Sequence, residues 1–280
     1  MDQLIIDNFI TNAIAEDQGD GDHTSLSTIP ANAQGQAKLL IKEQGILAGV
    51  SLALQIFSHI DPALTTEVFI HDGDEVQYGD IAFTVSGSVH SILLAERLVL
   101  NCMQRMSGIA TKTNKIVHSL AAYKTKLLDT RKTTPGLRYI EKWAVRIGGG
   151  VNHRIGLYDM ILIKDNHVDY AGGIVNAIQA ANRYLSDRDK QLQIEIEVRN
   201  LDELDQVLHY GNVDRIMLDN FSFDDLRQAV RIIGNKYITE ASGGITEENA
   251  AAYAACGVDY ISIGAITHSV KSLDMSLKAF

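Results

Sequence analysis

The chain is poor in cysteine and proline, which limits the kinds of site that it can hold. Its 280 residues include only three prolines and two cysteines, Cys102 and Cys256. The two cysteines form neither a CxxC motif nor the Cys/His spacing of a zinc site. We therefore expect two small, buried, reduced side chains and no cysteine-based metal centre.

The chain also lacks an excess of basic residues and any long apolar run. It has 35 acidic residues against 25 Lys and Arg, a net charge of -10 at pH 7. This balance argues against general binding to nucleic acid or to an anionic membrane surface. No apolar run reaches membrane-spanning length, and the first residues lack the basic region of a signal peptide. We expect a cytoplasmic protein that binds neither nucleic acid nor membrane.

The first part of the sequence predicts a small domain of mixed helices and strands. An N-terminal stretch with helical spacing is followed by strand-like runs at 37–42, 66–71 and 81–87. A long helical pattern begins at Ala95, and we expect it to break or kink near Ser107-Gly108 and to bridge the two halves of the chain.

From Lys124 onward, short apolar strands alternate with helical stretches. The expected strands are 126–131, 160–166, 193–199, 215–220, 237–244 and 260–265. Continuous apolar strands separated by helices are typical of parallel βαβ units. Six of them without a Gly-x-Gly-x-x-Gly motif favour an α/β barrel over a dinucleotide-binding sheet.

A block of basic residues falls within this barrel pattern. The segment 131–164 contains seven Lys and Arg residues and only two acidic residues. The C-terminal ends of barrel strands meet at one mouth, so we expect five cationic or titratable side chains to converge there. They are Arg131, Lys132, His153, Arg154 and Lys164. Cations buried together repel one another unless an anion neutralises them. A solvated basic face is the alternative, but Lys164 ends an apolar strand, so we predict a small anionic ligand.

Acidic residues end the strands that follow the cations. Glu197 and Asp219 are hard carboxylates that suit Mg²⁺ next to substrate phosphates, or that could accept hydrogen bonds from ribose hydroxyls. Glu195 and Glu197 share a face only if their strand stays regular, and we expect one of the two to alternate outward from a half-buried strand.

The last two predicted strands end in glycine-rich turns, "ASGGIT" (241–246) and "SIGAITHS" (262–269). Such turns before helix starts commonly form the phosphate site of a barrel from backbone N–H groups. His268 could donate to the same phosphate. Arg97, next to Glu96 in the long helix, would by itself form a surface ion pair.

Seven ordered motifs resemble the quinolinate phosphoribosyltransferase family over essentially the whole chain. They are "DTRKTTPGLR", "GGGVNHR", "MILIKDNH", "IEIEV", "IMLDNF", "EASGGI" and "ISIGAITHS", and "GDHTS" and "AERLVLN" precede them. The resemblance implies an α/β fold with an N-terminal α/β sandwich domain (1–110) and an open seven-stranded α/β barrel (111–269), the tail 270–280 packing back on the first domain.

The resemblance also implies a reaction of NAD biosynthesis, catalysed by a glycosyltransferase of the pentosyltransferase class. Quinolinate and 5-phosphoribosyl-1-pyrophosphate would give nicotinate mononucleotide, pyrophosphate and CO₂, with Mg²⁺ as cofactor. The catalytic residues implied are Lys132, Lys164, Glu197 and Asp219, the last two also near the metal and the ribose.

The remaining site residues are implied in the same way. Quinolinate would be held by Arg131, His153, Arg154 and Lys164, and Lys132 would reach the pyrophosphate or a carboxylate. The 5′-phosphate and neighbouring contacts would come from Ser242, Gly243, Gly244, Gly264 and His268. Arg97 would be donated across the interface of a homodimer, which could assemble further.

Two alternatives remain open from the sequence. One is a phosphoribosyltransferase of the same fold with another substrate, such as nicotinate or that of the molybdenum-utilisation relative. A nicotinate enzyme would need fewer cations around its single carboxylate. The other is a non-catalytic barrel that binds a phosphorylated metabolite, which would have no use for Glu197 and Asp219 beside the anion.

Overall fold

The computed structural model describes residues 3–280, which fold into two compact units. The first unit contains the described residues up to Asn114 together with 134–149 and 269–280. The second contains 115–133 and 150–268. Three segments that were expected within the barrel belong to the first unit, namely 111–114, 134–149 and residue 269.

The first unit is built on an antiparallel sheet of four strands in the order β12-β1-β5-β3. The strands are β1 (Gln34–Ile41), β3 (Thr65–Val68), β5 (Ile81–Ser88) and β12 (Met275–Ala279). A second, two-stranded sheet pairs β2 (Gly45–Ile46) with β4 (Glu75–Val76). The edge strand β12 comes from the end of the chain, with Ala279 opposite Ala37.

Helices complete the core of the first unit. They are α1 (Gln3–Gln18), α2 (His23–Thr28), α3 (Val50–Ile60) and α5 (Arg138–Ile147), together with most of α4 (Val89–Ser119). The buried rings of Phe57 in α3 and Phe83 in β5 meet edge to face with their centroids 5.8 Å apart, so α3 packs on the sheet.

The long helix α4 is continuous from Val89 to Ser119, and the expected break at Ser107-Gly108 is wrong. These two residues are contact points instead. Ser107 Oγ accepts a hydrogen bond from the Ala48 N–H (2.8 Å) and donates one to the Ala48 carbonyl (3.1 Å). A Cβ at Gly108 would lie 2.2 Å from the Lys271 carbonyl oxygen. The glycine is therefore needed for the close approach of the C-terminal segment. The last residues of the helix, 115–119, belong to the second unit.

The second unit contains a parallel sheet of six strands in the order β6-β11-β10-β9-β8-β7. The strands are β6 (Lys126–Leu128), β7 (Ile161–Ile163), β8 (Ile194–Val198), β9 (Arg215–Asp219), β10 (Ile238–Ser242) and β11 (Tyr260–Ser262). All six lie within the ranges expected from the sequence. A parallel bridge between Val151 and Leu128 adds a further backbone segment next to β6. The unit is thus an open, barrel-like α/β structure.

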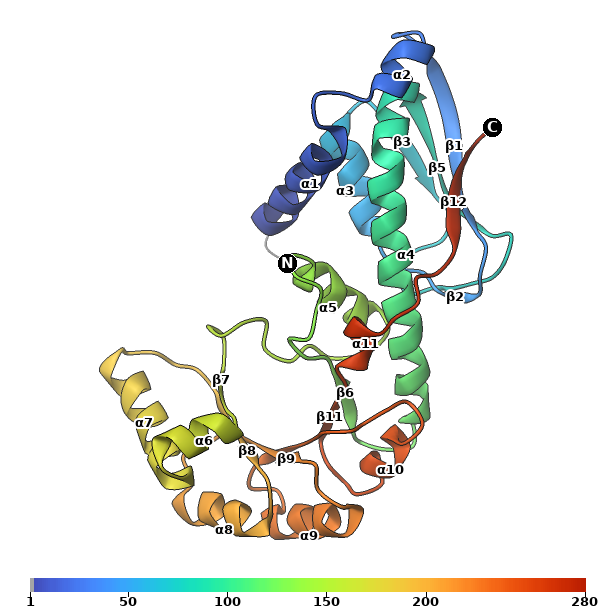
Figure 1. Ribbon diagram of the computed structural model, residues 1–280. Helices are drawn as coiled ribbons and strands as arrows, with labels where there is room; N and C mark the ends of the chain where they lie inside the picture. The colour runs from blue at the N-terminus through green and yellow to red at the C-terminus, as the bar shows by residue number, and fades with distance from the viewer. Residues whose placement is uncertain (1–2) are drawn as a thin grey trace. The chain divides into compact units, whose positions relative to one another are not determined.

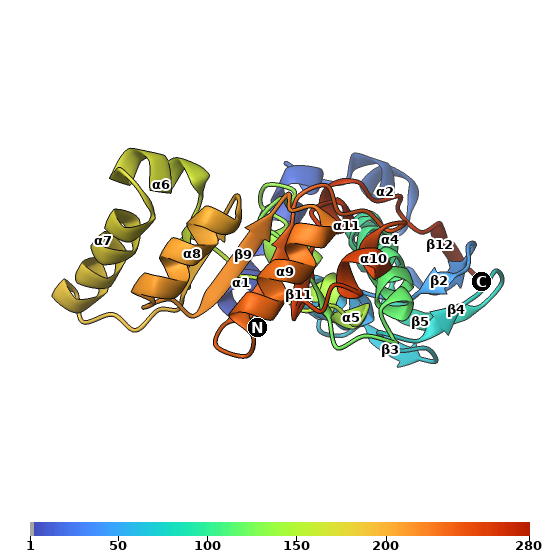
Figure 2. The same cartoon turned by 90° about the horizontal axis from the view of Figure 1, so that it is seen from below.

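Helices connect these strands in the right order for parallel βαβ units. They are α6 (Asp165–Ala171), α7 (Ile174–Asp187), α8 (Leu201–Tyr210), α9 (Phe223–Ile233), α10 (Ala250–Ala254) and α11 (Ala265–His268). Helices α7, α8 and α9 lie side by side in chain order along the outer side of the strands (Figure 1 and Figure 2). Asn200 and Ser222 begin α8 and α9 by accepting hydrogen bonds from the N–H groups of Glu203 and Asp225.

Parallel strands bring their carboxyl ends to one edge of the sheet, where barrel sites form. Among the described residues, no helix has both the length and the apolar character needed to cross a membrane.

Candidate active site

A cavity of about 310 Å³ opens among the carboxyl ends of the strands in the second unit. This volume falls in the range of small-molecule sites. Its lining consists of Thr130, Arg131, Lys132, His153, Arg154, Leu162, Lys164, Met217, Glu240, Ser242 and Ser262. The structure thus brings all five members of the expected cationic group together with Ser242, and the prediction of one converging site is confirmed.

The loop that carries His153 and Arg154 is held by a buried carboxylate. Asp129, fully buried after β6, accepts hydrogen bonds from the His153 N–H (2.8 Å) and from Asn152 Nδ2 (2.6 Å). Farther along, Asp159 accepts from the N–H groups of Ile155 and Gly156. These bonds fold the loop over the end of β6, so that both side chains enter the cavity.

The cations in the cavity have fewer counter-charges than they need. Burial lowers the pKa of Arg154, and the neighbouring charge of Arg131 lowers it further. The Arg131 Nε is buried and finds no hydrogen-bond partner in the described part of the chain. Lys132 likewise has no ion-pair partner within residues 3–280. Unpaired cations that raise one another's energy form an anion-binding site.

Lys164 and Glu197 form an ion pair at the rim. The Lys164 ammonium lies 3.3 Å from Glu197 Oε2, and its backbone begins α6. Burial raises the pKa of Glu197, Lys164 opposes this rise, and the nearby charge of Asp219 adds to it. Glu197 and Asp219 are therefore close enough to repel each other.

This carboxylate pair fits a hard divalent cation. Oxygen ligands at adjacent strand ends are the donor set that Mg²⁺ prefers, and a cation would relieve the repulsion between Glu197 and Asp219. Asp219 also accepts a hydrogen bond from Asn220 Nδ2 (2.6 Å), which orients one of its oxygens.

The expectation that one of Glu195 and Glu197 points outward is wrong. The strand β8 keeps a regular register with β9, placing Glu195 opposite Arg215 and Glu197 opposite Met217. With no bulge between them, residues two apart share a face. Both glutamates are buried on the inner face, where Glu195 contacts His153 and Glu197 contacts Lys164.

The two glycine-rich turns approach the cavity residues closely. A Cβ at Gly264 would lie 2.9 Å from Lys132 Cδ and 3.3 Å from the His268 ring. Gly243 has φ +90, and a Cβ there would lie 2.2 Å from Asn220 Oδ1, whereas Gly244 faces open space. Thr267 Oγ1 donates to the Lys132 carbonyl (2.8 Å), which fixes the loop that presents the lysine.

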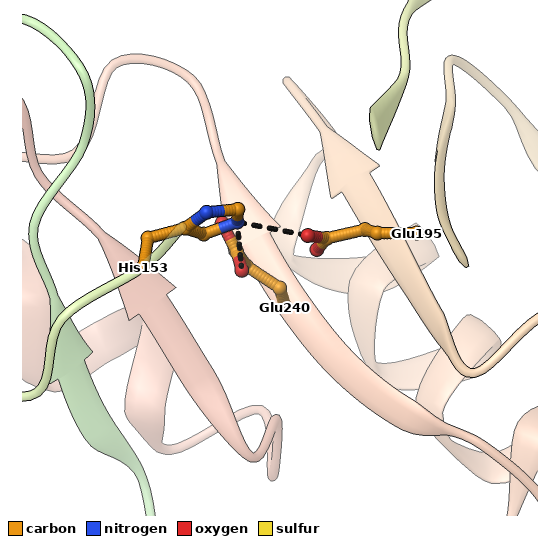
Figure 3. Close-up of side chains that lie close together, drawn as sticks. All are labelled: His153, Glu195 and Glu240. Carbon is orange, nitrogen blue, oxygen red and sulfur yellow. Dashed lines mark hydrogen bonds and ion pairs between the residues drawn. The ribbon is translucent and has the colours of Figure 1, made fainter. Parts of the chain in front are cut away.

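A buried polar cluster lies at the bottom of the cavity, and sequence reasoning missed most of it. The His153 ring sits between Glu195 of β8 and Glu240 of β10 (Figure 3). The His153 Nε2 lies 2.8 Å from Glu195 Oε2 and 3.5 Å from Glu240 Oε2, and Arg215 Nη1 lies 3.2 Å from Glu240. The signal for Glu240 was present, since it precedes Ser242 by two residues on an apolar strand and so shares its inward face.

The cluster has the composition of a cation site, with ligand atoms of His153, Glu195 and Glu240 all within 4.8 Å of one another. Its hydrogen bonds argue against a metal. The Arg154 N–H donates to His153 Nδ1 (2.7 Å), so the ring carries its proton on Nε2 and points that proton at Glu195. The Arg215 guanidinium supplies the positive charge that a metal would bring.

Arg97 belongs to the first unit and is exposed on α4. Within the described residues its guanidinium makes no hydrogen bond or ion pair, so the expected pair with a neighbouring acid such as Glu96 is not formed.

The chain matches known families over almost its whole length. Residues 22–107 match the N-terminal domain and residues 109–278 the C-terminal domain of quinolinate phosphoribosyl transferase. The nicotinate-nucleotide pyrophosphorylase [carboxylating] of Arabidopsis thaliana, a chloroplastic protein, is 48% identical over 95% of this chain and 80% of its own. A probable enzyme of the same name from Bacillus subtilis is 41% identical over 99% of this chain and 94% of its own.

A solved structure gives the same result for the fold. The nicotinate-nucleotide pyrophosphorylase from Francisella tularensis superposes with a TM-score of 0.90 at 40% identity, covering 100% of this chain and 98% of that one. Both domain matches, the sequence relatives and the structure agree on one assignment. The chain belongs to the quinolinate phosphoribosyltransferase family.

Proposed function

We propose that the protein transfers the phosphoribosyl group of 5-phosphoribosyl-1-pyrophosphate to quinolinate and removes one carboxylate as CO₂. The products are nicotinate mononucleotide and pyrophosphate, in NAD biosynthesis. The observation that carries the proposal is the cavity in which Arg131, Arg154 and Lys164 converge with too few counter-charges. A small dianion neutralises such a site, and the family relatives carry the name of this reaction.

The cations divide the work of binding. Arg131 and Arg154 offer planar forks to the two carboxylates of quinolinate, and Lys164 adds a point charge at the rim. His153 contributes differently from our expectation of a cation, because both of its ring nitrogens are engaged and the ring is neutral. It holds Glu195 and the Arg154 backbone in place.

Transfer of the ribose proceeds by departure of pyrophosphate from C1 and attack of the pyridine nitrogen at that carbon. Glu197 and Asp219 oppose the positive charge that develops on the ribose, and Lys132 faces the departing pyrophosphate. Mg²⁺ held with these two carboxylates would supply charge neutralisation for the pyrophosphate. The turns at Ser242–Gly244 and Gly264, with His268, hold the 5′-phosphate. The chain's own part is positioning and electrostatics, without a covalent nucleophile.

The proposal includes a cytoplasmic homodimer in which Arg97 completes the site of the neighbouring chain. An exposed arginine without an ion-pair partner among residues 3–280 supports this role for Arg97. Two free, buried cysteines, Cys102 and Cys256, are compatible with a reducing compartment.

The proposal is tested by incubating the protein with 5-phosphoribosyl-1-pyrophosphate, Mg²⁺ and either quinolinate or nicotinate. We expect pyrophosphate, CO₂ and nicotinate mononucleotide from quinolinate, and no product from nicotinate. Product from nicotinate alone, or no product from either, would overturn the assignment.

A variant pair links the activity to the cavity. Arg131→Ala should lower kcat/KM for quinolinate at least about tenfold, because a charge-assisted hydrogen bond contributes about 1.5–3 kcal/mol. The matched control is Lys126→Ala, an exposed cation at the start of β6, the strand that precedes Arg131, which should leave kcat/KM unchanged. Equal effects of the two changes would mean that the cavity does not bind quinolinate.

A further inference from the structure

The proposed reaction requires a proton donor for the decarboxylation step, and none of the residue roles given so far supplies one. When the carboxylate at C2 of the pyridinium departs as CO₂, the electron pair of the broken bond stays on C2, next to the quaternary nitrogen. That carbon must then take up a proton. The donor has to lie in the same cavity, because the reacting carbon is enclosed there with the carboxylates.

Most groups that line the cavity are poor proton donors. The guanidinium groups of Arg131 and Arg154 do not give up protons in proteins. The His153 ring is neutral, its Nδ1 accepts a hydrogen bond, and its remaining proton is held by Glu195. Of the two lysines, Lys164 is paired with Glu197, and Lys132 lies against Gly264 on the phosphate side.

Glu240 is the remaining acid, and it is the only carboxyl group among the cavity-lining residues of the described chain. It is fully buried at the bottom of the cavity, where Ser262 also lies. Its Oε1 accepts no hydrogen bond from a donor in the described residues, and a side-chain hydrogen bond joins the Glu240 and Glu195 carboxyl groups, which requires a proton between them.

The surroundings of Glu240 keep its carboxyl group protonated. Glu195 and Glu240 share one guanidinium, that of Arg215, which lies 4.0 Å from Glu195 Oε1 and 3.2 Å from Glu240 Oε2. Ionising both carboxyl groups would place two buried negative charges next to each other with one guanidinium as their shared ion-pair partner, so the charge of Glu195 disfavours ionisation of Glu240. Burial raises the pKa of Glu240 to about 8, and the charge of Glu195 contributes to the rise, while the hydrogen bond with Ser262 and the charge of Arg215 oppose it.

We propose that Glu240 is the proton donor of the decarboxylation step, a role that rests on the proposed function. The bond between C2 and its carboxylate breaks, CO₂ leaves, and the electron pair on C2 takes the proton of the Glu240 carboxyl group to form a C–H bond. Glu240 is left as a carboxylate beside Arg215 and regains its proton from water. Trapping the carbanion prevents CO₂ from adding back. General acids of this kind contribute about 10²–10⁴ in rate.

The test is to replace Glu240 by glutamine and to measure pyrophosphate and CO₂ release in the same reaction. Glutamine has the shape and neutrality of the protonated acid but no acidic proton. We expect Glu240→Gln to release pyrophosphate while CO₂ release slows at least about tenfold, so that the undecarboxylated quinolinate mononucleotide accumulates. Glu240→Asp retains an acid in a shorter side chain, and should release more CO₂ per pyrophosphate than Glu240→Gln.

The matched control is Glu141→Gln, which changes a fully buried glutamate of the first unit that pairs with Arg105. It should leave the ratio of CO₂ to pyrophosphate at one. A Glu240→Gln protein with an unchanged ratio overturns the inference, whether both rates are normal or both are reduced. If Glu240→Gln releases neither product, a Glu240→Asp ratio of one supports an acid at this position, and an Asp variant that is also inactive overturns it.

The two proposals fail in distinguishable ways. Wild-type protein that releases no pyrophosphate from quinolinate and 5-phosphoribosyl-1-pyrophosphate contradicts the proposed function. Wild-type activity with an unchanged product ratio in Glu240→Gln contradicts only the role of Glu240.

Discussion

At Gly264 the site has no room for a side chain, not even for a single methyl group. Its turn brings the chain so close to Lys132 and His268 that a methyl group would overlap the Lys132 side chain and crowd the His268 ring. Because the nearest atom belongs to the flexible chain of Lys132, the lysine can move aside at low cost to the fold. The cost falls on function, since a displaced lysine no longer faces the pyrophosphate.

Gly264→Ala should therefore raise KM for 5-phosphoribosyl-1-pyrophosphate by about tenfold or more, a loss of about 1.4 kcal/mol of binding, with little change in thermal stability. The matched control is Gly257→Ala, where φ is +90 but the nearest atom is 3.6 Å away. Backbone strain there should lower the unfolding midpoint and leave KM unchanged. Steady-state kinetics and thermal unfolding of both variants check the pair, and loss of stability rather than affinity in Gly264→Ala would contradict the assignment.

At the scale of elements, α4 shows how tertiary contacts can outweigh local propensity. A serine–glycine pair inside a helical pattern predicts a break or kink, because glycine is about 1 kcal/mol less favourable than alanine in a helix interior. In the fold, the same pair is where the helix touches Ala48 and the segment at Lys271. The missing side chain is a packing requirement, so the helix tolerates the glycine.

Helix propensity and packing predict opposite effects of Gly108→Ala on the stability of the protein. Propensity alone predicts stabilisation, whereas a Cβ 2.2 Å from the Lys271 carbonyl predicts a loss of about 1–3 kcal/mol from overpacking. We expect a lower unfolding midpoint for Gly108→Ala in thermal or denaturant unfolding. Asn101→Ala, at an exposed position of the same helix, isolates the propensity gain and should hold or raise the midpoint. A Gly108→Ala protein as stable as Asn101→Ala would show that the close approach is absent.

The strands of the barrel could be predicted from the sequence, whereas several of the charged residues on its inner face could not. Short apolar runs in the sequence predicted all six strands. The polar residues at the ends of these runs predicted the positions of Arg131, Lys164 and the glycine-rich turns in the site. The face of Glu195 was missed because both faces of β8 are buried, so its pattern has no polar side to mark which way is out. The inward face of Glu240 could have been inferred from Ser242, two residues later on the same strand. The partners of Glu240 and Arg215 could not, because they are far away in sequence and spacing along one strand does not show them.

At the scale of the whole molecule, the proposed exchange of Arg97 between chains predicts complementation. Arg97→Ala and Lys164→Ala should each be nearly inactive, but a mixed dimer contains one site with both groups intact. Random reassociation of equal amounts should restore about one quarter of wild-type sites, because half of the dimers are mixed and half of their sites are complete.

The control mixture is Lys164→Ala with Arg131→Ala. Both residues line the same cavity of one chain, so every site in that mixture lacks one group and activity should stay low. Activity measured after co-expression or refolding of the two mixtures separates the cases. Equal activity in both mixtures, high or low, would show that Arg97 does not act on a neighbouring chain.

The pairing of β12 with β1 has a consequence for how the protein is made. The first unit draws its edge strand from residues 275–279, which are translated after the whole of the second unit. The first unit therefore cannot close until these residues have been made, although most of its residues are translated first, and the second unit can fold earlier. Loss of residues 275–279 would leave β1 with an unpaired edge that promotes aggregation.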